Sequence, residues 1–423
     1  MKLHSVLINA VADALTDIFQ NSKYADKVVE QLLKSNSKWG SRDRAFIAET
    51  TYECVRWFRL YAVLSKEITV TASRTLSLRG TKQTGSDFDI PNFIRKDFID
   101  IIGVYLTLKN GESLDYRDFK HLDYLNLKTQ LDHISERKIK YSIPDWMDEV
   151  SEKELGAEKW AAELEALNKS ADVVLRCNTL KIKVLDLKKK LNDINIETGD
   201  TPLSMEALIL KKRTNVFSTE LFKKGLFEVQ DAGSQLIAPF LQAESGMRVI
   251  DACAGAGGKS LHLATLMQNK GTIISMDTEG RKLEELRKRA QRNGINIIET
   301  RTIESDKVIN RLHNSADRLL LDVPCSGLGV LRRNPDAKWK LNFEFLNEIR
   351  LLQAKILQNY SKVVKIGGKL VYATCSILPS ENENQIATFL ESNPNWKKLD
   401  EKKVSPTENG FDGFYMALLE RLS

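Results

Sequence analysis

Two cysteines in the last third of this 423-residue chain directly follow apolar segments that are typical of buried strands. Cys325 lies in Leu-Leu-Leu-Asp-Val-Pro-Cys-Ser-Gly at 319–327, and Cys375 lies in Leu-Val-Tyr-Ala-Thr-Cys-Ser at 370–376. A thiolate can add to an electron-poor carbon and so divide one difficult reaction step into easier ones. Two thiols at strand ends therefore predict covalent catalysis. The alternative, two small buried apolar side chains, would have to reach both strand ends by chance.

A glycine-rich turn upstream, Asp-Ala-Cys-Ala-Gly-Ala-Gly-Gly-Lys at 251–259, also leaves an apolar segment. Its glycines permit a tight turn and a close approach of the backbone to a ligand, toward which the next helix points its N-terminus. Asp277, which closes the next expected strand, is placed to accept hydrogen bonds from ribose hydroxyls, although it could simply begin the following helix. Together they predict an adenosyl cofactor. The predicted cofactor-binding residues here are Cys253, Ala254, Gly255, Ala256, Gly257, Gly258, Lys259 and Asp277.

The residues around the first cysteine indicate what the thiols act on. Carbon 5 of a pyrimidine is a poor nucleophile, and thiolate addition at carbon 6 makes it enamine-like. Enzymes that methylate an exocyclic amine need no thiol and carry an aromatic residue where this chain has Cys325, in Asp322-Val-Pro-Cys325. Asp322 is expected to hydrogen-bond the ring and to lie near the cofactor, and Lys259 to pair with Asp322 or with a substrate phosphate. The spacing leaves open which thiol attacks.

These motifs, in this order, resemble the RsmB/Sun branch of the RNA 5-methylcytosine methyltransferases over residues 170–420. The resemblance implies an enzyme that uses S-adenosylmethionine to methylate cytosine carbon 5 in small-subunit ribosomal RNA, with transfer RNA as the alternative. It implies that Cys375 is the nucleophile and that Cys325 assists product release. In DNA cytosine methylases the nucleophile lies in a Pro-Cys, and that arrangement would instead make Cys325 the nucleophile. A non-catalytic ribosome-assembly factor is disfavoured, because it needs no pair of placed thiols.

Two other segments match the family with small departures. The loop has Gly255 and Ala256 where the family usually has alanine and proline, and Glu304 stands where an aspartate would contact adenine. The stretch at 332–339 matches the family's Arg-Arg-x-Pro-Asp-x-Lys-Trp, which implies contacts with RNA, although Trp339 could instead belong to a core. The RNA-binding residues that this match implies are Arg332, Arg333 and Lys338.

Strands and helices alternate through the region that carries these motifs. Such alternation predicts a parallel, doubly wound α/β sheet covered on both faces, which bears its ligands at the carboxyl ends of its strands. By the resemblance, residues 231–423 form a class I methyltransferase domain. The strands are predicted at 247–252, 272–277, 297–303, 318–323 and 369–374.

The rest of the chain predicts two further parts. Residues 1–140 show helical periodicity, and the segment at 41–56 resembles the NusB-like helical domain of bacterial members. Residues 141–230 predict linker helices and a small α+β module similar to the family's RNA-recognition-like domain. Helices are predicted at 9–19, 44–63, 90–108, 147–167 and 184–191, module strands at 173–178, 208–210 and 227–229, and a mobile loop at 71–89.

Composition limits the partners. The net charge is +6, and residues 168–227 hold 12 Lys and Arg against 7 Asp and Glu, which favours RNA as a polyanionic partner over a merely solvated face. Lys188, Lys189 and Lys190 are the predicted contacts. The five cysteines form no Cys-x-x-Cys pair and the five histidines show no ligand spacing, so neither a disulfide nor a metal site is predicted. No apolar run approaches the ~20 residues of a membrane span, and we expect a cytoplasmic monomer.

Overall fold

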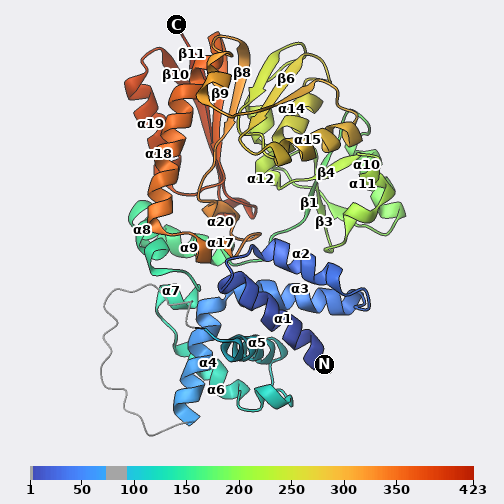
Figure 1. Cartoon of the computed structure of the whole chain (residues 1–423), viewed down its shortest axis with the longest axis vertical. Helices are drawn as coiled ribbons and strands as arrows, with labels where there is room; N and C mark the ends of the chain where they lie inside the picture. The colour runs from blue at the N-terminus through green and yellow to red at the C-terminus, as the bar shows by residue number, and fades with distance from the viewer. Residues whose placement is uncertain (1–2, 73–92) are drawn as a thin grey trace. The chain divides into compact units, whose positions relative to one another are not determined.

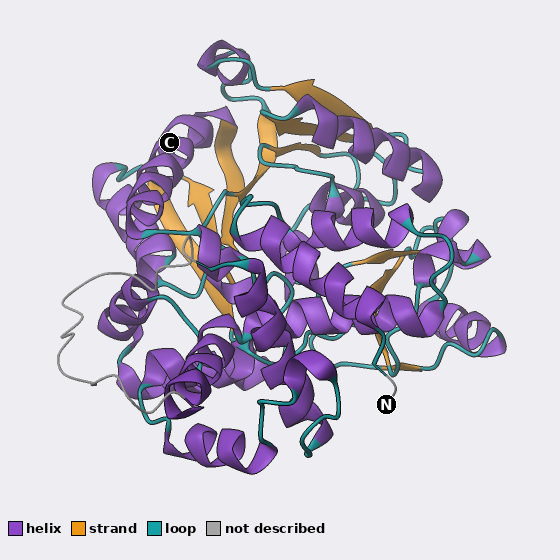
Figure 2. Cartoon of the chain, turned by 60° about the horizontal axis from the view of Figure 1, so that its bottom comes forward, coloured by secondary structure: helices purple, strands orange, loops and turns teal. Residues whose placement is uncertain are grey.

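The computed structural model describes residues 3–72 and 93–423, so that the predicted loop at 71–89 lies almost entirely outside them. Contacts group the chain into two compact units. Unit 1 comprises Met1–Asn168 and Arg333–Phe343, and unit 2 comprises Lys169–Arg332 and Glu344–Ser423. Strands occur only in unit 2 among the described residues (Figure 2). The domain boundaries predicted at residues 140 and 230 stay a prediction.

Unit 1 is built from helices around one apolar core, as its periodicity predicts. The predicted helix at 44–63 is two helices, because the helical conformation is interrupted at Trp57, and the first of them begins after the N-cap Gly40. Long helices of unit 1 are α1 (Ser5–Phe19), α2 (Ala25–Ser35), α3 (Ser41–Arg56), α4 (Phe58–Ala72), α5 (Arg95–Asn110), α6 (Tyr124–His133), α8 (Asp145–Leu155) and α9 (Ala157–Leu167). Short helices are α7 (Arg137–Lys140) and α17 (Ala337–Lys340).

The segment with α17 contributes an aromatic residue to the core of unit 1. The Trp339 ring packs edge-on against Phe58, with centroids 5.7 Å apart, and its Nε1 donates to the Val55 carbonyl at 2.7 Å. Trp339 therefore belongs to a core, which was the alternative to a role in the cytosine pocket.

A small antiparallel sheet in unit 2 forms the predicted α+β module. Its strand order is β2-β3-β1-β4, and α10 buries Leu187 and Leu191 against it. The predicted strands and helix are present, whereas the two-residue β2 was too short to predict. The module consists of β1 (Val174–Cys177), α10 (Val184–Asp193), β2 (Thr198–Gly199), β3 (Ala207–Leu210), α11 (Glu220–Lys223) and β4 (Phe227–Val229).

A seven-stranded sheet in the order β10-β11-β9-β8-β5-β6-β7 forms the rest of unit 2 (Figure 1). All five predicted parallel strands are present. The chain moves outward from β5 to β7 and then starts again at β8 beside β5, so the strand order reverses there, and ligands of such sheets bind at that reversal. The parallel strands are β5 (Arg248–Asp251), β6 (Thr272–Asp277), β7 (Ile298–Thr302), β8 (Ala316–Asp322) and β9 (Val364–Thr374).

An antiparallel pair, β10 (Trp396–Val404) and β11 (Phe414–Arg421), extends the sheet beyond β9. The sequence did not predict β10, because between its buried ends every residue of this edge strand is exposed and mostly charged. Charged edge strands are common because they discourage pairing with other chains.

Successive residues of a strand point to opposite sides of the sheet. Because buried apolar side chains lie on both sides, helices cover both faces. Val249 joins a core with α13, α14 and α15, whereas Ile250 joins a core with α18 and α19. Among the described residues, no helix has the length and apolar content needed to cross a bilayer. The remaining helices of this region are α12 (Ala232–Gln235), α13 (Ile237–Phe240), α14 (Gly258–Leu266), α15 (Gly280–Asn293), α16 (Asp306–Asn310), α18 (Phe343–Tyr360), α19 (Glu383–Ser392) and α20 (Pro406–Asn409).

Candidate active site

The glycine loop joins β5 to α14 and leaves its outer side open. Gly257 has φ +84°, and a Cβ there would lie 2.3 Å from Leu286 Cγ, so both conformation and packing require glycine. A Cβ on Gly255 or Gly258 would meet no atom within 4 Å. The backbone thus offers space at the start of α14, where amide groups point outward. This geometry fits an adenosyl cofactor held by backbone amides.

Asp277 braces the same loop from the end of β6. Its Oδ2 accepts from the Gly255 N–H at 2.9 Å, and its Oδ1 accepts from the Glu279 N–H at 2.9 Å. The carboxylate therefore shapes the loop and also serves the turn before α15. Glu304 is exposed just past the end of β7, next to Ile303, whose N–H donates to the Asp277 carbonyl at 2.9 Å. The predicted cofactor residues thus meet at the carboxyl ends of β5, β6 and β7, while their contacts with a cofactor stay predictions.

The two cysteines lie side by side beyond the ends of β8 and β9. Their Sγ atoms are 3.2 Å apart, and the Cys375 N–H donates to Cys325 Sγ at 3.3 Å. The strands are parallel neighbours with Asp322 opposite Ala373, so the loops that follow them emerge together. Both thiols are half-buried and free. The two thiols that the sequence places at strand ends therefore meet in the fold.

Lys259 and Asp322 form an ion pair next to the thiols, with Nζ 2.5 Å from Oδ2. Of the two partners expected for Lys259, the carboxylate is therefore the one it contacts. Burial alone would lower the pKa of Lys259, but the Asp322 carboxylate raises it, so the ammonium stays charged. The Lys259 ammonium also lies close enough to Cys375 for an electrostatic interaction.

Cys325 has the opposite surroundings. The hydrogen bond with Cys375, burial, and the negative charge of Glu381 raise the pKa of Cys325 well above its usual value. These surroundings favour the thiol form of Cys325, whose S–H can donate to the Cys375 sulfur.

A buried carboxyl group lies behind the cofactor loop. Asp251 is 1% exposed, and its Oδ2 accepts from Ser260 Oγ at 2.6 Å. Burial raises the pKa of Asp251 to about 7, although the Ser260 hydroxyl opposes this shift. Ser260 in turn accepts from Ser275 Oγ at 2.8 Å, which links α14 to β6.

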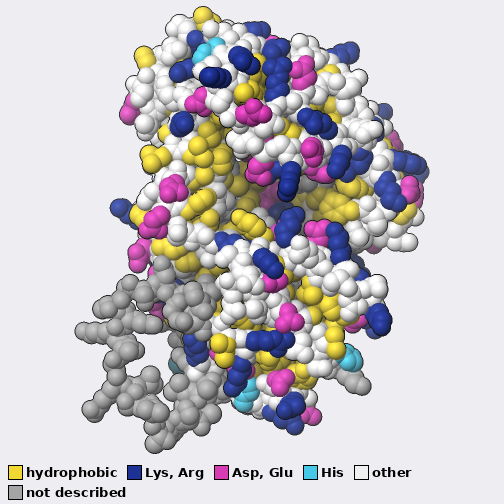
Figure 3. All heavy atoms as spheres, viewed as in Figure 1, with side chains coloured by type: hydrophobic (Ala, Val, Ile, Leu, Met, Phe, Trp, Pro, Cys, Tyr) yellow, Lys and Arg dark blue, Asp and Glu magenta, His cyan; other side chains and the backbone are white. Residues whose placement is uncertain are grey.

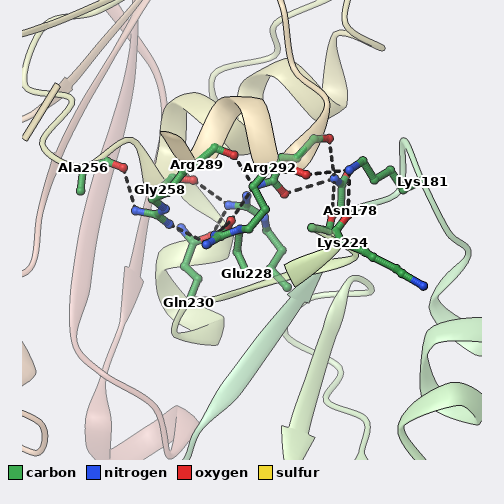
Figure 4. A network of polar contacts seen from close by, with 12 residues as sticks. Asn178, Lys181, Lys224, Glu228, Gln230, Ala256, Gly258, Arg289 and Arg292 are labelled. Carbon is green, nitrogen blue, oxygen red and sulfur yellow. Dashed lines mark hydrogen bonds and ion pairs between the residues drawn. The ribbon is translucent and has the colours of Figure 1, made fainter. Parts of the chain in front are cut away.

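A charge network ties the small module to the cofactor loop (Figure 4). Arg289 of α15 donates to the Ala256 carbonyl at 2.7 Å and to the Glu228 carboxylate at 2.9 Å. Arg176 of β1 donates to the Gly258 carbonyl at 2.7 Å. Glu228 of β4 is 3% exposed and also pairs with Arg292. Sequence reasoning missed this network, because these residues lie far apart along the chain.

The pKa of Glu228 shows that the network stays charged. Burial alone would raise the pKa of Glu228, but Arg289, Asn293 and Arg292 lower it. The carboxylate is therefore ionised and stabilises both guanidinium groups.

The second group of residues that sequence reasoning missed surrounds the thiols. Glu381, Gln353, Ser326 and Ser376 form a buried hydrogen-bonded cluster there. One signal was present, since each cysteine is followed by serine. The helix α19 begins at Glu383, with Asn382 as its N-cap.

The lysines of α10 have unequal surroundings. Lys189 and Lys190 are exposed and line a shallow cavity of about 690 Å³ with Lys181 and Lys183. Lys188 is partly buried and pairs with Asp200 at 2.6 Å. Figure 3 shows Lys and Arg side chains over α10 and α11 with acidic side chains among them. The predicted contacts of these lysines with RNA stay predictions.

Two of the three residues expected to contact RNA after the Pro-Cys loop are buried, and their RNA contacts stay predictions. Lys338 is 2% exposed inside unit 1, where its Nζ donates to the Arg56 carbonyl at 2.6 Å. Arg332 is also buried, and its guanidinium donates to the carbonyls of Gly410 and Ser170. Both cations are therefore occupied by backbone carbonyls and turned away from solvent. Arg333 is half-buried, and its RNA contact stays a prediction.

Comparison with known families agrees with these features. The family model described as 16S rRNA methyltransferase RsmB/F matches residues 238–420, and a model of the ferredoxin-like domain of RsmF/B-like methyltransferases matches residues 143–217. A probable ribosomal RNA small subunit methyltransferase B of Synechocystis sp. is 35% identical over 63% of this chain and 60% of its own length. The ribosomal RNA small subunit methyltransferase B of Shewanella oneidensis is 32% identical over 70% of this chain and 71% of its own.

Solved structures show the same fold. The crystal structure of PH0851 is 23% identical, covers 100% of both chains and has a TM-score of 0.79. The crystal structure of NSun6 from Pyrococcus horikoshii with SFG is 19% identical, covers 66% of this chain and 98% of its own, and has a TM-score of 0.61. The structural match to PH0851 extends over the whole of both chains. The sequence match to the Synechocystis relative, by contrast, spans about 60% of the length of that relative.

Proposed function

Because this chain belongs to the RsmB/F family of 16S rRNA methyltransferases, we propose that it transfers a methyl group from S-adenosylmethionine to carbon 5 of a cytosine in small-subunit ribosomal RNA. The observation that carries the proposal is the pair of sulfurs 3.2 Å apart beside the ion pair of Lys259 and Asp322. A protein that only bound RNA would need neither the thiol pair nor the ion pair.

Cys375 is the nucleophile in this proposal. Its sulfur bonds to carbon 6 while the ring's electron pair moves to N3, which takes up a proton from Cys325. Asp322, which is paired with Lys259, hydrogen-bonds the cytosine at N3 and its amino group. Carbon 5, now enamine-like, takes the methyl group.

Cys325 acts in the release step. Its sulfur receives the carbon-5 proton, the carbon 5–carbon 6 double bond re-forms, and the bond between Cys375 and carbon 6 breaks. The proton gained by N3 returns to solvent, so one proton is released for each methyl group transferred. The 3.2 Å between the sulfurs suits this division of labour, because carbons 5 and 6 are bonded neighbours.

The cofactor is held by residues on the β5, β6 and β7 side of the sheet. Gly255 to Gly258 would contact it through backbone atoms, Asp277 through the ribose, and Glu304 through adenine. NSun6 from Pyrococcus horikoshii, which shares this fold, was crystallised with SFG. S-adenosylmethionine supplies an electrophilic methyl group. Asp277→Ala should weaken its binding in calorimetry, and a chelator should leave the affinity unchanged.

The test uses the full chain with small-subunit RNA from a strain that lacks the gene. Labelled methyl groups should enter the RNA, and bisulfite sequencing should locate them at carbon 5 of specific cytosines. Methylation of transfer RNA alone would assign the alternative substrate. RNA binding without methylation would indicate an assembly factor and contradict the proposal.

A further inference from the structure

One fully buried carboxylate connects the two loops that carry the thiols. Glu381 is 0% exposed and ends the short 3-10 helix 379–381, six residues after Cys375. A buried carboxylate loses much of its hydration, and it is retained only when hydrogen-bond donors replace that water. Each donor that contacts Glu381 therefore contributes to holding the local backbone.

Donors from the Cys325 side approach both oxygens of Glu381. Oε1 accepts from the Ser326 N–H at 2.8 Å, and Oε2 accepts from Ser326 Oγ at 2.5 Å. Gln353 of α18 donates to Oε1 at 3.0 Å and also to the Pro324 carbonyl at 2.9 Å. The residues on both sides of Cys325 are thus held by Glu381 or by its partner Gln353.

Donors from the Cys375 side reach the same residue. Ser376 Oγ donates to Oε2 of Glu381, and Tyr372 of β9 donates its hydroxyl to the Glu381 carbonyl at 2.7 Å. A direct backbone contact supports the arrangement, because the Gly329 N–H donates to the Cys375 carbonyl at 2.9 Å. A Cβ on Gly329 would lie 2.4 Å from the Gly413 carbonyl oxygen, so this close approach requires glycine.

We propose that Glu381 is a positioning residue that holds Cys325 and Cys375 at the spacing needed for addition at carbon 6 and proton removal at carbon 5. The proposal rests on the proposed function. Both serines that follow the thiols bond to the same oxygen, so a shift of one loop is passed to the other through a single carboxylate.

The chemistry of the carboxylate makes the role specific. An ionised carboxylate only accepts hydrogen bonds, and four donors point at its two oxygens. In Glu381→Gln, an NH2 group must face some of these donors, so at least one serine hydroxyl or backbone N–H loses its acceptor. The negative charge that helps to raise the pKa of Cys325 is also lost.

A first experiment measures thiol proximity without methylation. Sulfurs 3.2 Å apart need only a small shift to reach the ~2 Å of a disulfide. Diamide should therefore cross-link Cys325 and Cys375 readily in the wild-type protein, read by mass spectrometry. We expect cross-linking at least about tenfold slower in Glu381→Gln and in Gln353→Ala, and unchanged in Glu391→Gln, an exposed glutamate of α19. Wild-type cross-linking rates in both cluster variants overturn the proposal.

A second experiment measures catalysis in the same variants. Misplacement of reacting groups by about 1 Å can cost 10²-fold in rate. Glu381→Gln should lower kcat by roughly 10- to 100-fold, with KM values for RNA and cofactor within about twofold of wild type. Glu381→Gln should also slow the decay of the covalent protein–RNA adduct. In a protein that already carries Cys325→Ala, adding Glu381→Gln should not slow this decay further, because both changes act on the same step.

The outcomes separate this role from general destabilisation. If Glu381→Gln lowers only the fraction of folded protein, and leaves kcat per active site and the adduct decay unchanged, the positioning role of Glu381 is overturned. If Cys325→Ala forms no adduct and the wild type does not methylate, the proposed function fails, while the cross-linking rates still decide whether Glu381 sets the thiol spacing.

Discussion

At the residue scale, the two thiols of this site differ in their charged neighbours. Lys259 stands near Cys375 and keeps its positive charge, whereas Glu381 stands near Cys325 and helps to raise its pKa. The sequence shows two similar cysteines at strand ends and cannot distinguish them by spacing. Their neighbours come from the start of α14 and from the turn before α19. The family resemblance implies that Cys375 is the nucleophile, and variants of the two cysteines test that assignment.

The division of labour predicts different fates for the two cysteine variants. Cys375→Ala should lose methyl transfer, because no other group supplies the ring activation. Cys325→Ala should still add and methylate, and then accumulate as a covalent protein–RNA complex that survives a denaturing gel. The adduct should require both cofactor and RNA, and the double variant should form none. An adduct in Cys375→Ala but not in Cys325→Ala would reverse the roles.

Asp251 predicts a dependence of stability on pH. Its pKa is raised to about 7 in the folded protein, so the folded state holds a proton that the unfolded state has lost between about pH 4 and 7. Its contribution to stability therefore falls as pH rises through that window. Asp251→Asn keeps an acceptor for Ser260 and should remove this dependence. From pH 5.5 to 8, the variant should gain about 2 kcal/mol relative to wild type. A parallel pH dependence of thermal or urea unfolding in both proteins would contradict this.

At the scale of elements, the small module and the cofactor loop are held together by charged side chains. β4 supplies Glu228, α15 supplies Arg289, and the loop supplies only carbonyl oxygens. A loop with glycines at 255, 257 and 258 has little rigidity of its own. Its conformation therefore depends on the module that packs behind it.

Glu228→Gln should weaken cofactor binding although Glu228 belongs to the small module. Without the carboxylate, Arg289 has only an uncharged partner at position 228, and its hydrogen bond to the Ala256 carbonyl should weaken. We expect a loss on the order of 1 kcal/mol, about fivefold in affinity, by calorimetry. Glu220→Gln, an exposed glutamate of α11 in the same module, is the matched control. Equal affinities in the two variants would show that the module does not influence the loop.

At the scale of the whole molecule, the basic surplus of residues 168–227 is concentrated in part on one helix. Exposed lysines attract a polyanion over a distance, whereas a lysine held in an ion pair has less charge to offer. Lys189 and Lys190 are exposed, and Lys188 pairs with Asp200. The three residues are therefore unequal candidates for RNA binding, although they are adjacent in the chain.

Reversal of Lys189 and Lys190 to Glu should weaken RNA binding and reduce its dependence on salt. Binding that neutralises fewer phosphates releases fewer counterions, so the slope of log affinity against log salt should become shallower by about 2. Lys188→Gln should have a smaller effect, and cofactor binding should not change in either variant. Unchanged RNA affinity after the double reversal would mean that this face is only solvated.

The sequence by itself determined the five parallel strands, the helical unit, the thiols at neighbouring strand ends and the glycine loop. These follow from local periodicity and from the rule that parallel strands present their carboxyl ends at one edge. Only the tertiary structure decided which polar side chains are buried and what they contact. Lys338 and Arg332 looked like RNA contacts, but they donate to backbone carbonyls inside the fold. Nothing in the sequence singled out Glu381, yet it joins both thiol loops. Most of these contacts connect residues tens to hundreds of positions apart, and no local pattern encodes which distant partner a buried polar group will find.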